Sequence, residues 1–532
     1  MNKSLKILAG VAALGLMLTG CSSNSADTTV TGGLADGPNV LRVIAGSEVG
    51  DMAPILADLK NETGVEIKVD YAGTLEGTQN VANGSMNGKY DATWFPSNRY
   101  LALLEGGTAA IAKEQKIMSS AVVLGVKPAV ATSLGWDKES PTWQKILEAV
   151  ETGELTYGMT SPVSSNSGFS ALIGAATALS GTGDALTVND VDSVTPALKT
   201  LFKGQTLTSG SSGWLAQKFS ENPTQDAIFN YESVLRSLTV ENQPLTIITP
   251  SDGVITADYP LSLLSSAVPE KQALFEKAST YLLSEKVQQK IHDLTKRNTK
   301  AGGSANGGAT AFELPFPNKI DTAQKLISTY LSSAKKPSHM VFDIDTSGSM
   351  GGNRIKQLKS ALLTMTDTAG GYNSFIAFQP RETINYVEFA NTVKSNKVFQ
   401  IDDTDREEQL RTIKKYIESL EADGGTAIYD SLEASYSNAL AAHKSNPDSF
   451  TSIVLFTDGE NTNGKSYNDF VTLYNQLAED NPEIKNIPVF TVRFGEGSSG
   501  ELAGLATLTG GKVFDASKTD LTRIFKEIRG YQ

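Results

Sequence analysis

Short apolar segments that alternate with helical ones constrain the fold of this chain more than any other feature. Residues 41–45 form an apolar run, residues 52–59 carry apolar side chains at helical spacing, and residues 65–69 alternate as a half-buried strand does. A strand, a helix and a second strand at this spacing predict a parallel α/β sheet. Residues 90–95 continue the pattern, and residues 121–126 indicate a strand that crosses into another lobe.

The alternation returns in the C-terminal part of the chain, where it predicts a mostly parallel sheet with helices on both faces. We expect strands at residues 340–342, 385–389, 452–456, 487–495 and 510–514, and helices at residues 355–366, 409–420, 430–443, 502–508 and 521–528. Residues 375–380 look like an insertion before the second of these strands, and the sequence assigns no role to them.

The length and composition predict more than one domain. The chain has 532 residues, of which 40% are hydrophobic, enough for sizeable cores. A Gly- and Asn-rich stretch at residues 298–308 predicts a flexible linker, and residues 321–332 predict a short helix with Asp321 as its N-cap. The expected division is a signal at 1–20, a tether at 21–39, a first domain at 40–300, a linker with the short helix at 301–335, and a second domain at 336–532.

The N-terminal segment resembles the signal of a bacterial lipoprotein. Lys3 and Lys6 precede an apolar run at residues 7–18, which is too short for an ordinary membrane span. Residues 18–21, Leu-Thr-Gly-Cys, resemble a lipobox, which implies that Cys21, the only cysteine, is diacylated and anchors the protein to the extracytoplasmic face of the cell envelope. A buried or free thiol is the alternative. The net charge of −13 argues against nucleic acid as a partner.

Two carboxylates and three hydroxyls stand at loop edges of the second predicted sheet. Asp345, Ser347 and Ser349 follow one apolar strand, Thr426 precedes a helix, and Asp458 ends another buried strand. Hard oxygen ligands of this kind suit Mg²⁺ or Mn²⁺, which prefer near-octahedral oxygen shells. Asp and Ser are also common turn and capping residues, so an ordinary turn is the alternative for any one of these segments.

The order and local sequence of these segments resemble the metal-ion-dependent adhesion site of the von Willebrand factor type A domain. The resemblance implies that Asp345, Ser347, Ser349, Thr426 and Asp458 hold the cation directly or through water. It also implies that an acidic side chain of a partner protein fills the open coordination position. Such a site binds a partner and breaks no bond.

The first domain resembles a type II extracellular solute-binding protein, of the kind that captures oxyanions such as molybdate. Residues 43–47, 61–67 and 283–289 carry the resemblance. It implies a two-lobed fold whose ligand loops hold Ser47, Thr74, Ser97, Ser165, Asn166, Ser167 and Tyr231. Ser and Thr at helix starts are also good caps. Because Glu48 and Glu76 bring negative charge near these loops, a neutral or cationic ligand is as plausible as an anion, and the site could also be vestigial.

The residues of the chain do not predict an enzyme. None of its three histidines lies near a Ser, Cys or Asp motif that would suggest a catalytic triad, and no Gly-rich phosphate loop of Walker type, His-Glu-x-x-His or Cys-x-x-Cys is present. We therefore expect a lipid-anchored extracytoplasmic binding protein that uses a divalent metal to bind a partner protein and carries a module for a small solute. A solute receptor of a transport system with an added docking domain is the alternative.

Overall fold

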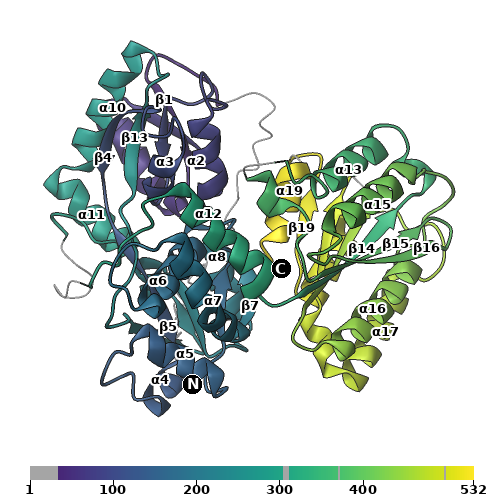
Figure 1. The fold of residues 1–532 in the computed structure, drawn as a ribbon. Helices are drawn as coiled ribbons and strands as arrows, with labels where there is room; N and C mark the ends of the chain where they lie inside the picture. The colour runs from purple at the N-terminus through teal and green to yellow at the C-terminus, as the bar shows by residue number, and fades with distance from the viewer. Residues whose placement is uncertain (1–33, 303–310, 370–371, 496–498, 520, 532) are drawn as a thin grey trace, which may run out of the picture.

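The computed structural model describes residues 34–302, 311–369, 372–495, 499–519 and 521–531. The predicted signal, Cys21 and much of the predicted tether and linker lie outside the described residues. Figure 1 shows two bodies, an N-terminal domain of two lobes and a C-terminal domain built on one sheet. Among the described helices, none is long and apolar enough to cross a membrane.

Lobe 1 contains a five-stranded sheet in the order β2-β1-β3-β13-β4. β1 (Val40–Ala45) runs parallel to β2 (Glu66–Tyr71) and β3 (Ala92–Trp94), which confirms the predicted parallel strands. β13 (Pro260–Leu264) is antiparallel to β3 and to β4 (Ile111–Lys116). The helices of this lobe are η1 (Ser47–Met52), α1 (Ala53–Thr63), α2 (Thr74–Ala82), α3 (Arg99–Leu103), α10 (Pro269–Leu282) and α11 (Glu285–Thr295).

Lobe 2 contains a second sheet in the order β11-β5-β8-β6-β7. β5, the predicted crossing strand, follows β4 of lobe 1 directly in the chain. The strands are β5 (Ser120–Val126), β6 (Tyr157–Thr160), β7 (Gln205–Ser209), β8 (Ala227–Tyr231) and β11 (Thr246–Ile248), and β12 (Thr256–Ala257) pairs with β5. β9 (Thr239–Val240) and β10 (Gln243–Pro244) form a small separate ladder. The helices are α4 (Pro128–Ser133), α5 (Trp143–Glu151), α6 (Asn166–Ser180), α7 (Val188–Lys203), α8 (Ser212–Glu221) and α9 (Glu232–Arg236).

The segment between the domains packs onto lobe 2. Its helix α12 (Ile320–Thr329) has Lys319 as N-cap, so the prediction of Asp321 in that place was wrong and Asp321 lies in the first turn. The apolar face of α12 lies against α7 and joins the hydrophobic core of the N-terminal domain. In the following turn, η2 (Tyr330–Ala334), the Tyr330 hydroxyl donates to Gln205 Oε1 at 3.2 Å.

The C-terminal domain has a six-stranded sheet in the order β16-β15-β14-β17-β18-β19, and the pair β15–β16 is its one antiparallel pair. The strands are β14 (Ser338–Asp345), β15 (Glu382–Phe389), β16 (Val393–Gln400), β17 (Phe450–Thr457), β18 (Val489–Arg493) and β19 (Val513–Asp515). The helices are η3 (Gly348–Met350), α13 (Asn353–Thr364), α14 (Asn373–Ile376), α15 (Arg406–Ser419), α16 (Ile428–Ser445), α17 (Tyr467–Asp480), η4 (Pro482–Asn486), α18 (Ser499–Thr509) and α19 (Leu521–Arg529). Helices pack on both faces of this sheet and form two hydrophobic cores, as the sequence predicts.

Candidate metal centre and solute site

Two predicted metal ligands come out at the same edge of the C-terminal sheet. Asp345 is the last residue of β14, and Asp458 directly follows β17. These strands are adjacent and parallel, so their carboxyl ends meet at one edge, where ligands bind in open α/β sheets. Both aspartates are buried.

The loop after β14 is folded tightly around Asp345. Asp345 Oδ1 accepts a hydrogen bond of 2.8 Å from the backbone N–H of Ser347, and Oδ2 accepts one of 2.7 Å from the Thr457 hydroxyl. The hydroxyls of Ser347 and Ser349 lie 3.1 Å apart. Ser347 is buried and Ser349 is exposed, so the oxygen cluster reaches from the sheet edge to the surface. Thr457, which holds Asp345 in place, was not predicted.

The loop that carries Thr426 joins this edge through the backbone. The N–H of Gly348 donates to Gly424 O at 2.8 Å, and the N–H of Asp423 donates to Thr346 O at the same distance. Thr426 itself is buried, and its N–H donates to the Thr462 hydroxyl at 2.9 Å. The structure thus brings together the three loops that carry the predicted ligands.

The charges at this edge are unbalanced in a way that fits a divalent cation. Burial raises the pKa of Asp345 above its ordinary value, and the nearby Asp458 carboxylate adds to that shift. Asp458 Oδ1 is buried without a hydrogen-bond partner among the described residues, although its Oδ2 accepts from Arg354 Nη1 at 2.7 Å. A buried carboxylate oxygen without a partner is costly, and a metal ion would supply the missing interaction. No group of three or more His, Cys, Asp or Glu suited to a metal occurs among the described residues, so any cation here would depend on hydroxyl ligands as well.

Three of the predicted solute ligands lie together in lobe 2 at the start of α6. Ser165 is the N-cap of α6, and the hydroxyls of Ser165 and Ser167 are 3.2 Å apart. Ser212, at the start of α8, completes this serine cluster, because its hydroxyl lies 2.8 Å from that of Ser167. Asn166 Nδ2 donates to the Tyr231 hydroxyl at 3.1 Å. Ser212 was missed, and the turn-forming run Ser209-Gly-Ser-Ser after a strand was the available signal.

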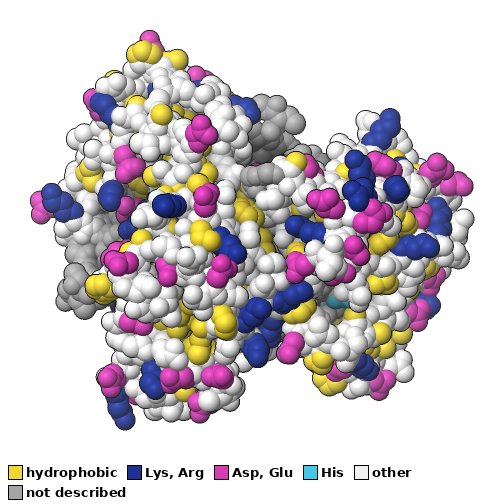
Figure 2. Space-filling model, viewed as in Figure 1, with side chains coloured by type: hydrophobic (Ala, Val, Ile, Leu, Met, Phe, Trp, Pro, Cys, Tyr) yellow, Lys and Arg dark blue, Asp and Glu magenta, His cyan; other side chains and the backbone are white. Residues whose placement is uncertain are grey.

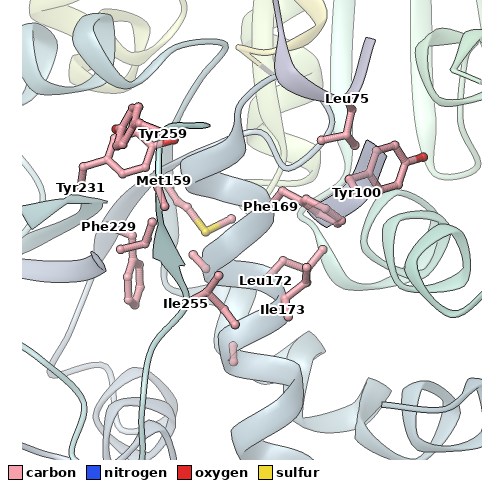
Figure 3. Packing of buried hydrophobic residues seen from close by; sticks show 14 of the residues in the cluster. Leu75, Tyr100, Met159, Phe169, Leu172, Ile173, Phe229, Tyr231, Ile255 and Tyr259 are labelled. Atoms are coloured by element: carbon pink, nitrogen blue, oxygen red, sulfur yellow. The ribbon is translucent and has the colours of Figure 1, made fainter. Parts of the chain in front are cut away.

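Tyr231 marks the junction between the lobes. It lies at the end of β8 in lobe 2, and its ring is 6.0 Å from that of Tyr259, which precedes β13 in lobe 1 (Figure 3). Burial and the nearby Glu48 carboxylate of lobe 1 both raise the pKa of Tyr231, and burial raises the pKa of Glu48 itself. A carboxylate is therefore part of this junction, as the sequence indicates.

The remaining predicted ligands belong to lobe 1 and make no hydrogen bond to the serine cluster. Thr74 starts α2 and is buried, Ser47 starts η1 and is exposed, and Ser97 follows β3 and accepts from the N–H of Arg99 at 3.2 Å. None of the three is an N-cap, because Gly46, Gly73 and Asn98 hold that position in η1, α2 and α3, so the capping alternative does not apply to them.

Arg297 was not predicted, and it fixes the loop that bears Ser47 and Glu48. Its buried guanidinium binds both carboxylate oxygens of Asp51 at 2.8 and 2.6 Å and donates to Glu48 O at 2.9 Å. It also lies 4.8 Å from the centre of the Tyr259 ring.

Separate parts of the chain match two protein families. Residues 41–293 match "Bacterial extracellular solute-binding protein", and residues 339–527 match "von Willebrand factor type A domain". The first match covers both lobes, and the second covers the sheet whose edge carries Asp345 and Asp458.

Individual relatives are similar to part of the chain. Over 137 residues the chain is 31% identical to inter-alpha-trypsin inhibitor heavy chain H2 of Mus musculus. This match covers 24% of this chain and 13% of that protein. A von Willebrand factor A domain-containing protein of Dictyostelium discoideum is 29% identical over 152 residues, covering 27% of this chain and 16% of that protein. These matches therefore span only a small part of the relatives' length.

Among solved structures, similar chains include a ferric binding protein from Campylobacter jejuni, at 13% identity and a TM-score of 0.41, covering 55% of this chain and 98% of that one. The sulfate-binding protein SubI from Mycobacterium tuberculosis has 16% identity and a TM-score of 0.39, covering 53% and 93%.

Proposed function

This chain joins a bacterial extracellular solute-binding domain to a von Willebrand factor type A domain, and we propose that it is a binding protein that attaches to a partner protein through a divalent cation. Asp345, Ser347, Ser349, Thr426 and Asp458 would hold Mg²⁺ or Mn²⁺, and an acidic side chain of the partner would complete the coordination. Acyl chains on Cys21 would keep the protein at the extracytoplasmic face of the bacterial envelope. In this proposal the chain catalyses no reaction.

One observation supports this function most directly: Asp458 Oδ1 is buried beside a second buried carboxylate and has no hydrogen-bond partner in the part of the chain that the structure describes. A structural role alone would favour pairing both aspartates, since an unpaired buried acceptor costs about 1–3 kcal/mol. A metal ion would place a positive charge between the two aspartates and could still bind a further carboxylate. Thr457 and the N–H of Ser347 hold Asp345 in one orientation for that purpose.

Titration of the full chain with Mn²⁺, followed by calorimetry and by the electron paramagnetic resonance of free Mn²⁺, tests the metal site. We expect one tight site in the wild type, and at least a hundredfold weaker binding in Asp345→Asn and Asp458→Asn. Asp480→Asn is the matched control, because Asp480 is exposed at the end of α17. Equal Mn²⁺ affinity in all four proteins would refute the proposal.

A solute receptor with an added docking domain is the second candidate function. The serine cluster with Tyr231 and Glu48 favours it, because polar groups from both lobes meet at one junction. A thermal-shift panel of sulfate, molybdate, neutral amino acids and spermidine tests it on the full chain. We expect one class of solute to raise the melting temperature of the wild type but not of Tyr231→Phe with Ser167→Ala. No shift with any class would favour the vestigial alternative.

A further inference from the structure

The C-terminal domain contacts lobe 1 next to a predicted solute loop. Lys526 on α19 forms an ion pair of 2.6 Å with Glu76, which lies in the first turn of α2. The same ammonium group is 5.4 Å from the centre of the Tyr372 ring. The backbone N–H of Tyr372 donates to Gln79 Oε1 of α2 at 2.8 Å. Both domains therefore meet along one side of α2.

Apolar packing supports these polar contacts. Tyr372, Phe375 and Ile376, in and beside α14, are buried in the hydrophobic core of the N-terminal domain. Phe375 and Ile376 are the first two residues of the insertion at residues 375–380, to which the sequence assigned no role. The insertion thus begins as a contact between domains.

The end of α19 contacts lobe 2. A methyl group built on Gly530 would lie 2.5 Å from Gly210 Cα and 2.9 Å from Ser164 Oγ, so the two backbones are in close contact. The rings of Tyr531 and Trp214 are 4.5 Å apart. α19 and the residues that follow it therefore touch both lobes, and Figure 1 shows α19 on the side of its domain that faces them.

The C-terminal domain and lobe 2 also line an open cavity away from the lobe junction, along a contact that we call the seam. Its volume is about 560 Å³, and it is lined by residues of lobe 2 and of the C-terminal domain, including Lys218, Lys336 and Lys485. Figure 2 shows Lys and Arg side chains gathered along this seam. The domains are apart at this cavity, whereas α19 and α14 contact the lobes directly.

These contacts stand next to the predicted solute loops and require the lobes to be close. Glu76 is two residues past Thr74, and Ser164 directly precedes Ser165. A methyl group on Gly73 would lie 2.8 Å from Ser164 O, so lobe 1 and lobe 2 touch at this place. Separation of the lobes would move Glu76 away from Ser164, and α19 could not keep contact with both.

We propose that the C-terminal domain docks across the two lobes only when they are closed, and that docking in turn holds them closed. The inference rests on the proposed solute-binding role of the lobes, whose exchange of solute would then require undocking. Linkage makes the effect reciprocal, because a domain that binds one of two conformations shifts the equilibrium toward it. Gly530 is the central position, since it leaves no room for a side chain.

Distance measurements between spin labels on the full chain test the proposal without solute or metal. Cys21→Ser removes the native thiol, and spin labels are attached to cysteines introduced at exposed positions. The pair Lys89→Cys and Lys138→Cys measures the distance between the lobes, and the pair Lys89→Cys and Lys415→Cys measures the distance between the domains. In the wild type we expect one narrow distance for each pair. In Gly530→Ala we expect both distributions to broaden, with at least a threefold larger population at long lobe–lobe distances.

Matched variants separate docking from folding. Gly213→Ala in α8 is the control, because a methyl group there meets no atom within 4 Å. Lys526→Glu should act as Gly530→Ala does, and the exchange of charges in Glu76→Lys with Lys526→Glu should restore the narrow distances. The proposal would be overturned if the domains separated while the lobes stayed closed, or if the lobes opened while the domains stayed docked. It would also be overturned if the variants changed neither distance. Because no solute is used, failure of the proposed solute function leaves this result unaffected.

Discussion

Arg354 Nη1 lies 2.7 Å from Asp458 Oδ2 and forms the salt bridge nearest to the proposed metal centre. The same nitrogen donates to Ser349 O at 2.9 Å, so the guanidinium of α13 connects two of the loops that carry metal ligands. Its positive charge balances part of the negative charge that a cation would otherwise meet. Arg354 would thus compete with the proposed cation, and it connects the loops in the structure.

Removal of that charge should strengthen metal binding. In Arg354→Gln we expect the Mn²⁺ affinity to rise about tenfold, which is about 1.4 kcal/mol, because a positive charge close to the site opposes the cation. Calorimetric titration at low ionic strength measures the change, and added salt should reduce it. Arg411→Gln, an exposed change on α15, serves as control. A weaker affinity in Arg354→Gln would show that Arg354 organises the site more than it competes with the metal.

The buried carboxylate Glu382 should hold the C-terminal domain together. It lies 2.9 Å from both Lys335 and Arg529, and although burial alone would raise its pKa, these cations lower that pKa to about 2. In Glu382→Gln the two cations lose their partner, and we expect the unfolding free energy to fall by about 3–5 kcal/mol. Urea unfolding of the full chain measures the loss, with the exposed Glu407→Gln as control.

A second result follows from the position of Arg529 on α19, the helix that contacts both lobes. Loss of Glu382 should also loosen docking, so the domain–domain distance should broaden in Glu382→Gln before the domain unfolds. Because the pKa of Glu382 is lowered, its contribution is present above about pH 4.5 and is lost as pH falls toward 2. A variant as stable as the wild type would refute the role of the buried group.

The sequence predicted elements whose apolar pattern is local and missed those that depend on distant partners. β14 and β17 are apolar runs buried on both faces, so they were found, whereas β16 is largely exposed and is defined by its hydrogen bonds to β15. The metal ligands follow a motif of short segments. Arg354 and Asp458 are 104 positions apart, and Lys526 and Glu76 are 450 positions apart, so no local pattern indicates either pair. From sequence alone, a charged residue on a surface helix is expected to contact solvent, so an ion pair with a distant residue is missed.

Acid should weaken the C-terminal domain through His339. This histidine is buried on β14, no described residue forms a hydrogen bond with its Nε2, and burial lowers its pKa to about 4. The unfolded chain therefore binds the proton more readily, so its contribution to stability is present above about pH 6.5 and is lost as pH falls toward 4. We expect His339→Phe to abolish up to about 3 kcal/mol of this pH dependence. Urea unfolding between pH 4 and 7 measures it, with His443→Gln as control.

Arg297 should determine the stability of lobe 1 and the position of Glu48. In Arg297→Lys the charge stays, but an ammonium group cannot bind Asp51 through one nitrogen, donate to Glu48 O through a second and contact the Tyr259 ring, as the planar guanidinium does. We expect a loss of about 2–4 kcal/mol in unfolding free energy. Trp94 Nε1 donates to Tyr259 O at 3.1 Å, so tryptophan fluorescence should report the change directly. Unchanged fluorescence and stability, as expected of the control Arg411→Lys, would mean that Asp51 and Tyr259 hold this loop without Arg297.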